Sequence, residues 1–171
     1  MAEELRRRSV ASFERVSGGT KHLVRVATAE DATSIGRLLH DFNREFNEPT
    51  PSPDALADRI RYLLDHGDTV VLLVGNGPEG LAVLRFRPAI WSTKLESYLA
   101  ELYVGPEHRE QGLGRALMEE VLNEARVRGA DTMSIEVDEP DMAARHLYER
   151  LGFSNHQDGT GPLMYVYERE L

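Results

Sequence analysis

The sequence contains no cysteine among its 171 residues. A disulfide framework, a cysteine nucleophile and a thiolate metal site are therefore excluded for this chain. The six histidines show no metal-ligand spacing and have no cysteine partners, so we predict no metal site. A chain without cysteine also fits a cytoplasmic protein, which is the location that we expect.

Long hydrophobic runs are also missing. The longest uninterrupted aliphatic stretch, Val70–Val74, is far too short to cross a bilayer. No apolar segment follows the basic cluster Arg6–Arg8, as it would in a secretory signal peptide. We therefore expect neither membrane insertion nor secretion.

Positive charge is in short supply, because the formal net charge at pH 7 is −9. Binding to nucleic-acid phosphates requires clustered Lys and Arg, which here are scattered or confined to the N-terminal residues. We therefore predict no nucleic-acid partner. The negative charge mildly favours cationic substrates, although an acidic surface commonly serves only to keep a protein in solution.

The most informative segment is a strand pattern that leads through two glycines into a helix pattern. In the strand pattern Glu101 and Tyr103 alternate with apolar residues, and the helix pattern continues as far as Gly129. Gly112 and Gly114 then lie at the start of the helix, where unpaired N–H groups and the positive end of the dipole favour a phosphate. Glycines lack Cβ, so the anion can approach the backbone closely. We call residues 109–115 the cradle and predict that it binds an anion.

Other meanings of this glycine pattern are less suitable. A Walker loop requires Gly-Lys-Ser/Thr, which the chain lacks, and Leu117 occupies the third-glycine position of a dinucleotide-binding motif. A tight connection with no ligand remains the alternative when the segment is taken alone.

Three sequence motifs resemble those of the GCN5-related N-acetyltransferase (GNAT) family. Two of them are fairly specific at this separation: ELYVGPEHREQGLGRALM at 101–118 and AARHLYERLGF at 143–153. The third, VRVATAEDATSI at 24–35, is similar to the usual opening strand and helix and is weak alone. The resemblance covers most of residues 23–171. None of these motifs specifies the acyl acceptor.

The expected fold class is a single α/β domain over residues 22–171, preceded by a flexible tail at 1–21. Periodicity and capping signals predict helices after Thr28 and after Ser52. The strands that we expect are 23–26, 69–74, 81–86, 99–104, 133–138 and a closing strand at 163–168. The resemblance implies a mixed, mostly antiparallel twisted sheet flanked by helices, whose strands ending near Val104 and Val137 splay apart at an acetyl-CoA site.

The same resemblance implies acetyl-CoA as co-substrate and suggests which residues bind it. Backbone groups of one strand would contact the pantetheine and the cradle would hold the pyrophosphate; the residues are Leu102, Tyr103, Val104, Arg109, Glu110, Gln111, Gly112, Leu113, Gly114 and Arg115. Asp141 stands where many relatives carry Asn, seven residues before Tyr148. An ionised carboxylate accepts but does not donate a hydrogen bond, which weakens the assignment of Asp141 as a cofactor contact.

The reaction implied by the resemblance sets the catalytic residues to look for. A primary amine with a pKa near ~10.4 is neutral in only about one molecule in a few thousand at pH 7, so a base assists its attack on the thioester. Tyr148 matches the tyrosine that protonates the departing thiolate in the family, although its helical spacing alone suggests a packed aromatic residue. Glu101 and Glu136 compete as the base, and the absence of a dedicated base is the third alternative.

The expected function is acetyl transfer to a primary amine of a small molecule. A peptide or protein amine, as in the ribosomal-protein alanine acetyltransferases, is the alternative within the family, and a non-catalytic acyl-CoA-sensing module is the alternative outside enzymes. We expect acceptor recognition from residues 42–53, from the strand face with Glu101 and Tyr103, and from residues 155–162. Exposed strand edges often pair across subunits in this family, which suggests a homodimer.

Overall fold

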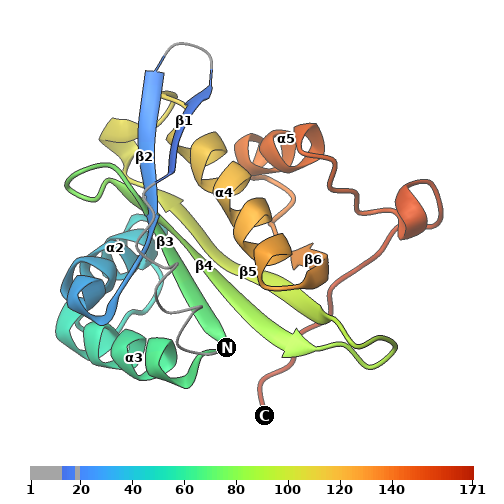
Figure 1. The fold of residues 1–171 in the computed structure, drawn as a ribbon, viewed down its shortest axis with the longest axis horizontal. Helices are drawn as coiled ribbons and strands as arrows, with labels where there is room; N and C mark the ends of the chain where they lie inside the picture. The colour runs from blue at the N-terminus through green and yellow to red at the C-terminus, as the bar shows by residue number, and fades with distance from the viewer. Residues whose placement is uncertain (1–12, 18–19) are drawn as a thin grey trace. The chain divides into compact units, whose positions relative to one another are not determined.

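The computed structural model describes residues 13–17 and 20–171 of the chain (Figure 1). Six strands form one sheet in the order β1-β2-β3-β4-β5-β6. Their bounds are β1 Phe13–Ser17, β2 Thr20–Val26, β3 Thr69–Val74, β4 Gly80–Pro88, β5 Leu95–Val104 and β6 Ala130–Ile135. The α helices described are α2 Ala32–Glu45, α3 Pro53–His66, α4 Leu113–Val127 and α5 Met142–Arg150, and short 3-10 turns are η1 Ala29–Asp31, η2 Pro106–His108 and η3 Gln157–Gly159. The chain divides into two compact units, with the boundary between Ser134 and Ile135.

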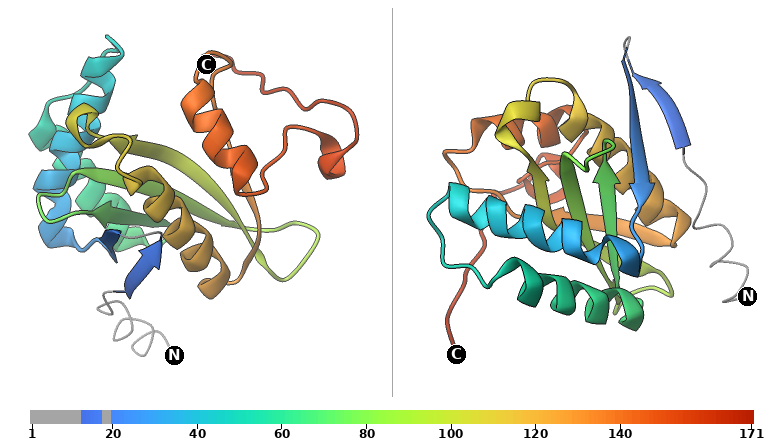
Figure 2. Two further views of the ribbon diagram at one scale, coloured as in Figure 1. Left: turned by 90° about the horizontal axis from the view of Figure 1, so that it is seen from above. Right: turned by 90° about the vertical axis from the view of Figure 1, so that its left-hand side faces the viewer.

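The sheet is mostly antiparallel, because each strand from β1 to β5 pairs antiparallel with the next. β5 and β6 run in the same direction: Leu95 donates to the carbonyl of Gly129, and Ser97 Oγ donates to the carbonyl of Thr132. Helices α2 and α3 cover one face of the first unit's sheet and α4 covers the other (Figure 2). This arrangement confirms the predicted mixed, mostly antiparallel fold.

The predicted capping signals of the first two long helices are confirmed. Asp31 accepts a hydrogen bond from the Thr28 N–H at 2.8 Å, which closes the capping box before α2. Ser52 caps α3 by accepting from Ala55 N–H, and Gly67 ends that helix with a φ of 81°. The two helices pack a common apolar core onto the sheet; its buried residues are Ala27, Ala32, Ile35, Leu38, Ala57, Ile60, Val71, Leu73, Leu81, Val83 and Tyr103.

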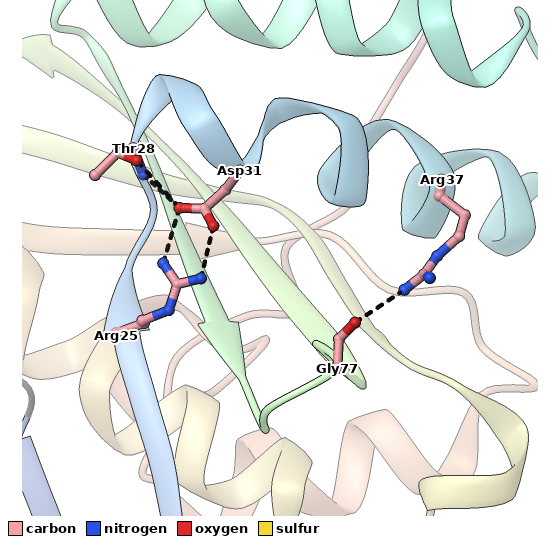
Figure 3. A network of polar contacts seen from close by, with 5 residues as sticks. All are labelled: Arg25, Thr28, Asp31, Arg37 and Gly77. Atoms are coloured by element: carbon pink, nitrogen blue, oxygen red, sulfur yellow. Dashed lines mark hydrogen bonds and ion pairs between the residues drawn. The ribbon is translucent and has the colours of Figure 1, made fainter.

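A charged network ties the end of β2 to the start of this helical layer (Figure 3). The Arg25 guanidinium donates to both carboxylate oxygens of Asp31, at 2.8 and 2.6 Å. Farther along α2, Arg37 donates to the carbonyls of Gly77 and Pro78 in the turn between β3 and β4. The helical layer is therefore attached by charged hydrogen bonds to two places on the sheet.

The structure differs from the prediction at both ends of the chain. β1 and the start of β2 lie within the segment predicted as a tail, and they pair residue by residue from Phe13↔Val24 to Ser17↔Thr20. Residues 1–12 and 18–19 of that tail lie outside the described residues. The domain boundary near residue 22 stays a prediction.

Two predicted strands are wrong in extent or existence. β6 covers 130–135 instead of 133–138, and residues 136–138 have no strand conformation. The predicted closing strand at 163–168 is absent, because the chain folds back on itself locally: Leu163 bridges to His156, and Met164 N–H donates to the carbonyl of Asn155. The alternating apolar pattern of residues 163–168 therefore does not form a strand in the structure.

None of the helices in the described ranges 13–17 and 20–171 combines the length and apolar character needed to span a bilayer.

We expect Asp31→Asn to destabilise the protein at neutral pH and to lose its effect in acid. The hydrogen bond from Arg25 lowers the pKa of Asp31 to about 2, below the ordinary value of about 3.9. A depressed pKa stabilises the fold above about pH 4, and this contribution is lost as the pH falls through about 2. Because the Arg25 side chain is 36% exposed, solvent screening limits the loss to about 1 kcal/mol.

Urea unfolding of the wild type and the variant at pH 7, 4 and 2.5 measures this difference. A difference that is constant over the three pH values would contradict the prediction.

Candidate functional site

Strand β5 carries an irregularity just before the predicted site. Glu101 lies opposite Val83 and Leu99 lies opposite Leu84, so Ala100 is an extra residue in β5. Such a bulge bends a strand and increases its local twist, and bulges are common next to active sites. Beyond the bulge, Glu101 and Tyr103 share one face of the strand, as the sequence predicted. The structure shows that α2 and α3 cover this face, because the partners Val83 and Leu81 belong to their common core.

Glu101 is a half-buried carboxylate on this face. Burial raises its pKa above the ordinary value, because a charged carboxylate loses solvation there. Within the part of the chain that the structure describes, this side chain forms no hydrogen bond or ion pair, so its oxygens are free to accept a proton. These properties suit a general base.

Tyr103 is more deeply placed, with 5% of its surface exposed. Its ring lies 5.1 Å from that of Phe42 on α2. Burial, and next the charge of Glu45 and a hydrogen bond to it, raise the pKa of Tyr103. The side chain of Tyr103 therefore belongs to the core, and only its backbone is suited to the predicted pantetheine contact.

The cradle follows β5 and η2 along the chain. Two of its residues have positive φ, Glu110 at 61° and Gly112 at 85°. Helix α4 then begins at Leu113, and the Ala116 N–H donates to the carbonyl of Gly112. The N–H groups ahead of Ala116 in the first turn have no partner within the helix, as at any helix start. They supply several donors and the positive end of the helix dipole at one place, as the sequence predicted.

The two arginines and the glutamine of the cradle already have partners within the protein. Arg109 Nε donates to the carbonyl of Val104 at 2.9 Å, and its Nη2 donates to Glu45 at 2.8 Å. Arg115 pairs with Glu119 one turn along α4, and the Gln111 side chain donates to the carbonyl of Glu107. The predicted phosphate contacts of Arg109, Gln111 and Arg115 stay predictions.

A pocket that the sequence analysis did not predict lies beside the start of the cradle. Its volume is about 530 Å³, within the usual range for small-molecule sites. The lining residues come from α2, the β3–β4 turn, the end of β5 and η2, and are Arg37, Leu38, Asp41, Gly77, Pro78, Glu79, Tyr103, Gly105, Pro106, Glu107 and His108. These residues lie in three separate stretches of the chain, within 37–41, 77–79 and 103–108, and form no sequence motif.

In the second unit, Tyr148 lies on α5 and is 8% exposed, with its ring 6.0 Å from that of Phe153. Burial, and next the negative charge of Asp141, raise the pKa of Tyr148 to about 12. Asp141 caps α5 by accepting from the Ala144 N–H at 3.0 Å. This carboxylate therefore has a structural role in addition to its predicted cofactor contact.

Glu136 lies in different surroundings from those predicted. It is exposed and follows the end of β6, so it does not lie on a half-buried strand. The described residues contain no group of three or more His, Cys, Asp or Glu side chains placed to hold a metal ion.

Comparison with known proteins now identifies the family. The model of the acetyltransferase (GNAT) family matches residues 35–153. The chain belongs to the GNAT family. The match contains both β5 with the cradle and α5 with Tyr148.

Individual relatives agree with this assignment. A crystal structure of a candidate acetyltransferase from Arthrobacter sp. FB24 is 45% identical with a TM-score of 0.80, and the match covers 92% of this chain and all of that one. The [ribosomal protein bS18]-alanine N-acetyltransferase of Escherichia coli K12 is 44% identical over 34% of this chain and 40% of its own length. The mycothiol acetyltransferase of Thermobispora bispora is 35% identical over 68% of this chain and 35% of its own length. The chain thus covers less than half of the length of each of these two curated relatives.

Tyr148 should remain protonated well into the alkaline range, because its pKa is raised to about 12. We expect Tyr148→Phe and the wild type to have equal tyrosinate absorbance at pH 10, where a phenol with that pKa is about 1% ionised. Ultraviolet difference spectroscopy measures this. A loss of tyrosinate signal in the variant would show that Tyr148 ionises in an ordinary way.

Proposed function

We propose that the protein is an N-acetyltransferase that transfers the acetyl group of acetyl-CoA to a primary amine of a small molecule. The observation that carries the proposal is the cradle: a left-handed Gly112 leads directly into the first turn of α4, in a chain that belongs to the GNAT family. This arrangement offers backbone donors where a pyrophosphate would bind.

The residues present fit acetyl-CoA. Gly112, at a φ of 85°, directly precedes the first turn of α4, and the N–H groups of that turn have no partner within the helix. Backbone groups of residues 102–104 would contact the pantetheine, and the N–H groups of residues 112–115 would bind the pyrophosphate. The acetyl thioester is the group that acetyl-CoA supplies.

The chemistry requires that one proton leaves the amine and another reaches the sulfur. The amine nitrogen attacks the thioester carbonyl, a C–N bond forms, and the C–S bond breaks to release the thiolate. The half-buried Glu101 is better suited than the exposed Glu136 to accept the amine proton, because its pKa is raised. Tyr148, with a pKa of about 12, is protonated at neutral pH and can donate its proton to the thiolate.

Three observations bear on the acceptor. The mycothiol acetyltransferase, whose name refers to a small molecule, matches over two thirds of this chain at 35% identity, and this supports a small-molecule acceptor. The net charge of −9 mildly favours a cationic one. A protein N-terminal alanine is the second candidate, supported by the 44% identity to the bS18 acetyltransferase over a shorter segment. A cytoplasmic location and a homodimer stay predictions from the sequence.

The decisive test is CoA release from acetyl-CoA with a panel of amines: polyamines, aminoglycosides, amino acids and peptides with N-terminal alanine. We expect turnover with one of these acceptor classes.

Gly112→Ala should weaken CoA binding by about tenfold or more, because it strains the backbone at a φ of 85° and adds a methyl group to the cradle.

Gly129→Ala is the matched control. Gly129 lies beyond the other end of α4 with a φ of 89°, and an added Cβ would meet nothing within 4 Å. Both variants should lose about 1 kcal/mol of stability, whereas only Gly112→Ala should lose CoA affinity. Equal CoA affinity of the two variants, measured by titration calorimetry, would contradict the cradle as the pyrophosphate site.

The acid and base assignments have separate variants. Glu101→Gln should lower kcat by about 100-fold or more, and its pH profile should lose the rise in activity that accompanies ionisation of the raised Glu101 pKa. Glu136→Gln should change kcat by less than about threefold.

Tyr148→Phe should lose turnover while it still binds CoA, and Tyr62→Phe, on the exposed side of α3, is its control.

Steady-state kinetics from pH 5 to 9 with the best amine measures these effects. A large loss in Glu136→Gln with none in Glu101→Gln would reverse the assignment of the base. Unchanged turnover in Tyr148→Phe would remove that phenol from the mechanism.

A further inference from the structure

Arg109, the first residue of the cradle, contacts two elements of the first unit, β5 and α2. Its Nε donates to the carbonyl of Val104, the last residue of β5, at 2.9 Å. Its Nη2 donates to the carboxylate of Glu45, the last residue of α2, at 2.8 Å. The Arg109 guanidinium carbon also lies 5.9 Å from the centre of the Tyr103 ring, within the range of a cation–π contact.

The ion pair at Glu45 is one of the less exposed in the described chain. The Glu45 side chain is 26% exposed and that of Arg109 is 42% exposed. The Tyr103 ring, which Arg109 contacts, packs against the ring of Phe42. The centre of the Phe42 ring in turn lies 5.4 Å from that of Phe46. Polar and aromatic contacts thus connect the end of α2 to the end of β5.

The predicted acceptor-recognition segment, residues 42–53, contains the last turn of α2 and the chain that follows it. Its turn is closed by two backbone hydrogen bonds, from Asn47 N–H to the carbonyl of Arg44 and from Glu48 N–H to the carbonyl of Asn43. Asn47 has a positive φ of 58°. The geometry of this turn therefore follows directly from where the last residues of α2 are held.

We propose that Arg109 is a positioning residue that couples the acetyl-CoA cradle to the acceptor-recognition turn through Glu45. The inference rests on the proposed function, because the cradle must bind CoA. Arg109 uses Nε and Nη2 for Val104 and Glu45, and a guanidinium has five N–H donors in all. Its remaining donors are available to a phosphate while the contact with Glu45 is kept.

Bound CoA then limits the motion of the Arg109 side chain further. Because Glu45 is paired with Arg109, the last residues of α2 also become less mobile. Coupling of this kind is a free energy shared by two sites, typically a factor of about 5 to 150 in an equilibrium. It makes the acceptor-recognition turn better ordered when the co-substrate is present.

Amide hydrogen exchange with and without saturating CoA tests the coupling without any knowledge of the acceptor. In the wild type we expect CoA to slow exchange at Asn47 and Glu48 by about fivefold or more. In Glu45→Gln the ratio of exchange rates without and with CoA should fall to about one, whereas CoA should still bind, because Glu45 is not among the predicted phosphate contacts. A purely structural ion pair would change both rates equally and leave the ratio as in the wild type.

Glu96→Gln is the matched control, because Glu96 also forms an ion pair between two elements, with Arg87 at 2.6 Å on β4. It should keep the wild-type exchange ratio. An unchanged ratio in Glu45→Gln, or faster or equal exchange in the wild type with CoA bound, overturns the inference and leaves the proposed function intact. Failure of the wild type to bind CoA overturns both.

Discussion

The pairing of β4 with β5 is the interaction on which the rest of the site depends. It runs from Gly80↔Val104 to Pro88↔Leu95 with one irregularity, between Val83 and Leu84. At its site end the backbones are close, since a Cβ on Gly80 would lie 2.7 Å from the carbonyl oxygen of Tyr103. The Gly105 N–H then donates to the carbonyl of Glu79. Hydrogen bonding between these two segments therefore continues beyond the strands as far as η2, which precedes the cradle. The cradle thus follows a strand whose position is fixed by its neighbour, and sites supported by such rigid elements are more precise than sites on loops.

Local signals in the sequence were enough to predict the parts that depend on near neighbours. The strand Thr69–Val74, the cap at Ser52 and the glycine at the start of α4 all have the predicted positions. Each rests on a strong local constraint: a continuous apolar run, a side chain that accepts an N–H, or a backbone conformation suited to glycine. The two faces of β5 beyond the bulge were predictable for the same reason.

The parts that depend on distant residues were not predictable. Strict alternation would put Leu99 and Glu101 on one face, whereas the extra Ala100 separates them. Glu45 carries no sequence signal, because its partner Arg109 is 64 residues away. The segment 163–168 has the alternation of a strand but pairs only locally, at Leu163 and Met164. Alternation specifies which side chains share a face, but it does not specify a pairing partner.

The bulge at Ala100 also bears on which insertions and deletions the protein tolerates. Residues 101–104 take their register from 80–83, on the site side of the bulge, while 95–99 take theirs from 84–88. The connection between the two strands lies at the far end of the ladder, where Ile90 and Trp91 are 85% and 94% exposed. Lengthening or shortening that hairpin loop leaves the pairing beside Glu101 untouched, because loop closure becomes costlier only slowly with length. Related chains are therefore free to vary in length at this loop, whereas a gain or loss of one residue between Glu101 and Gly112 would displace the cradle from the strand that supports it.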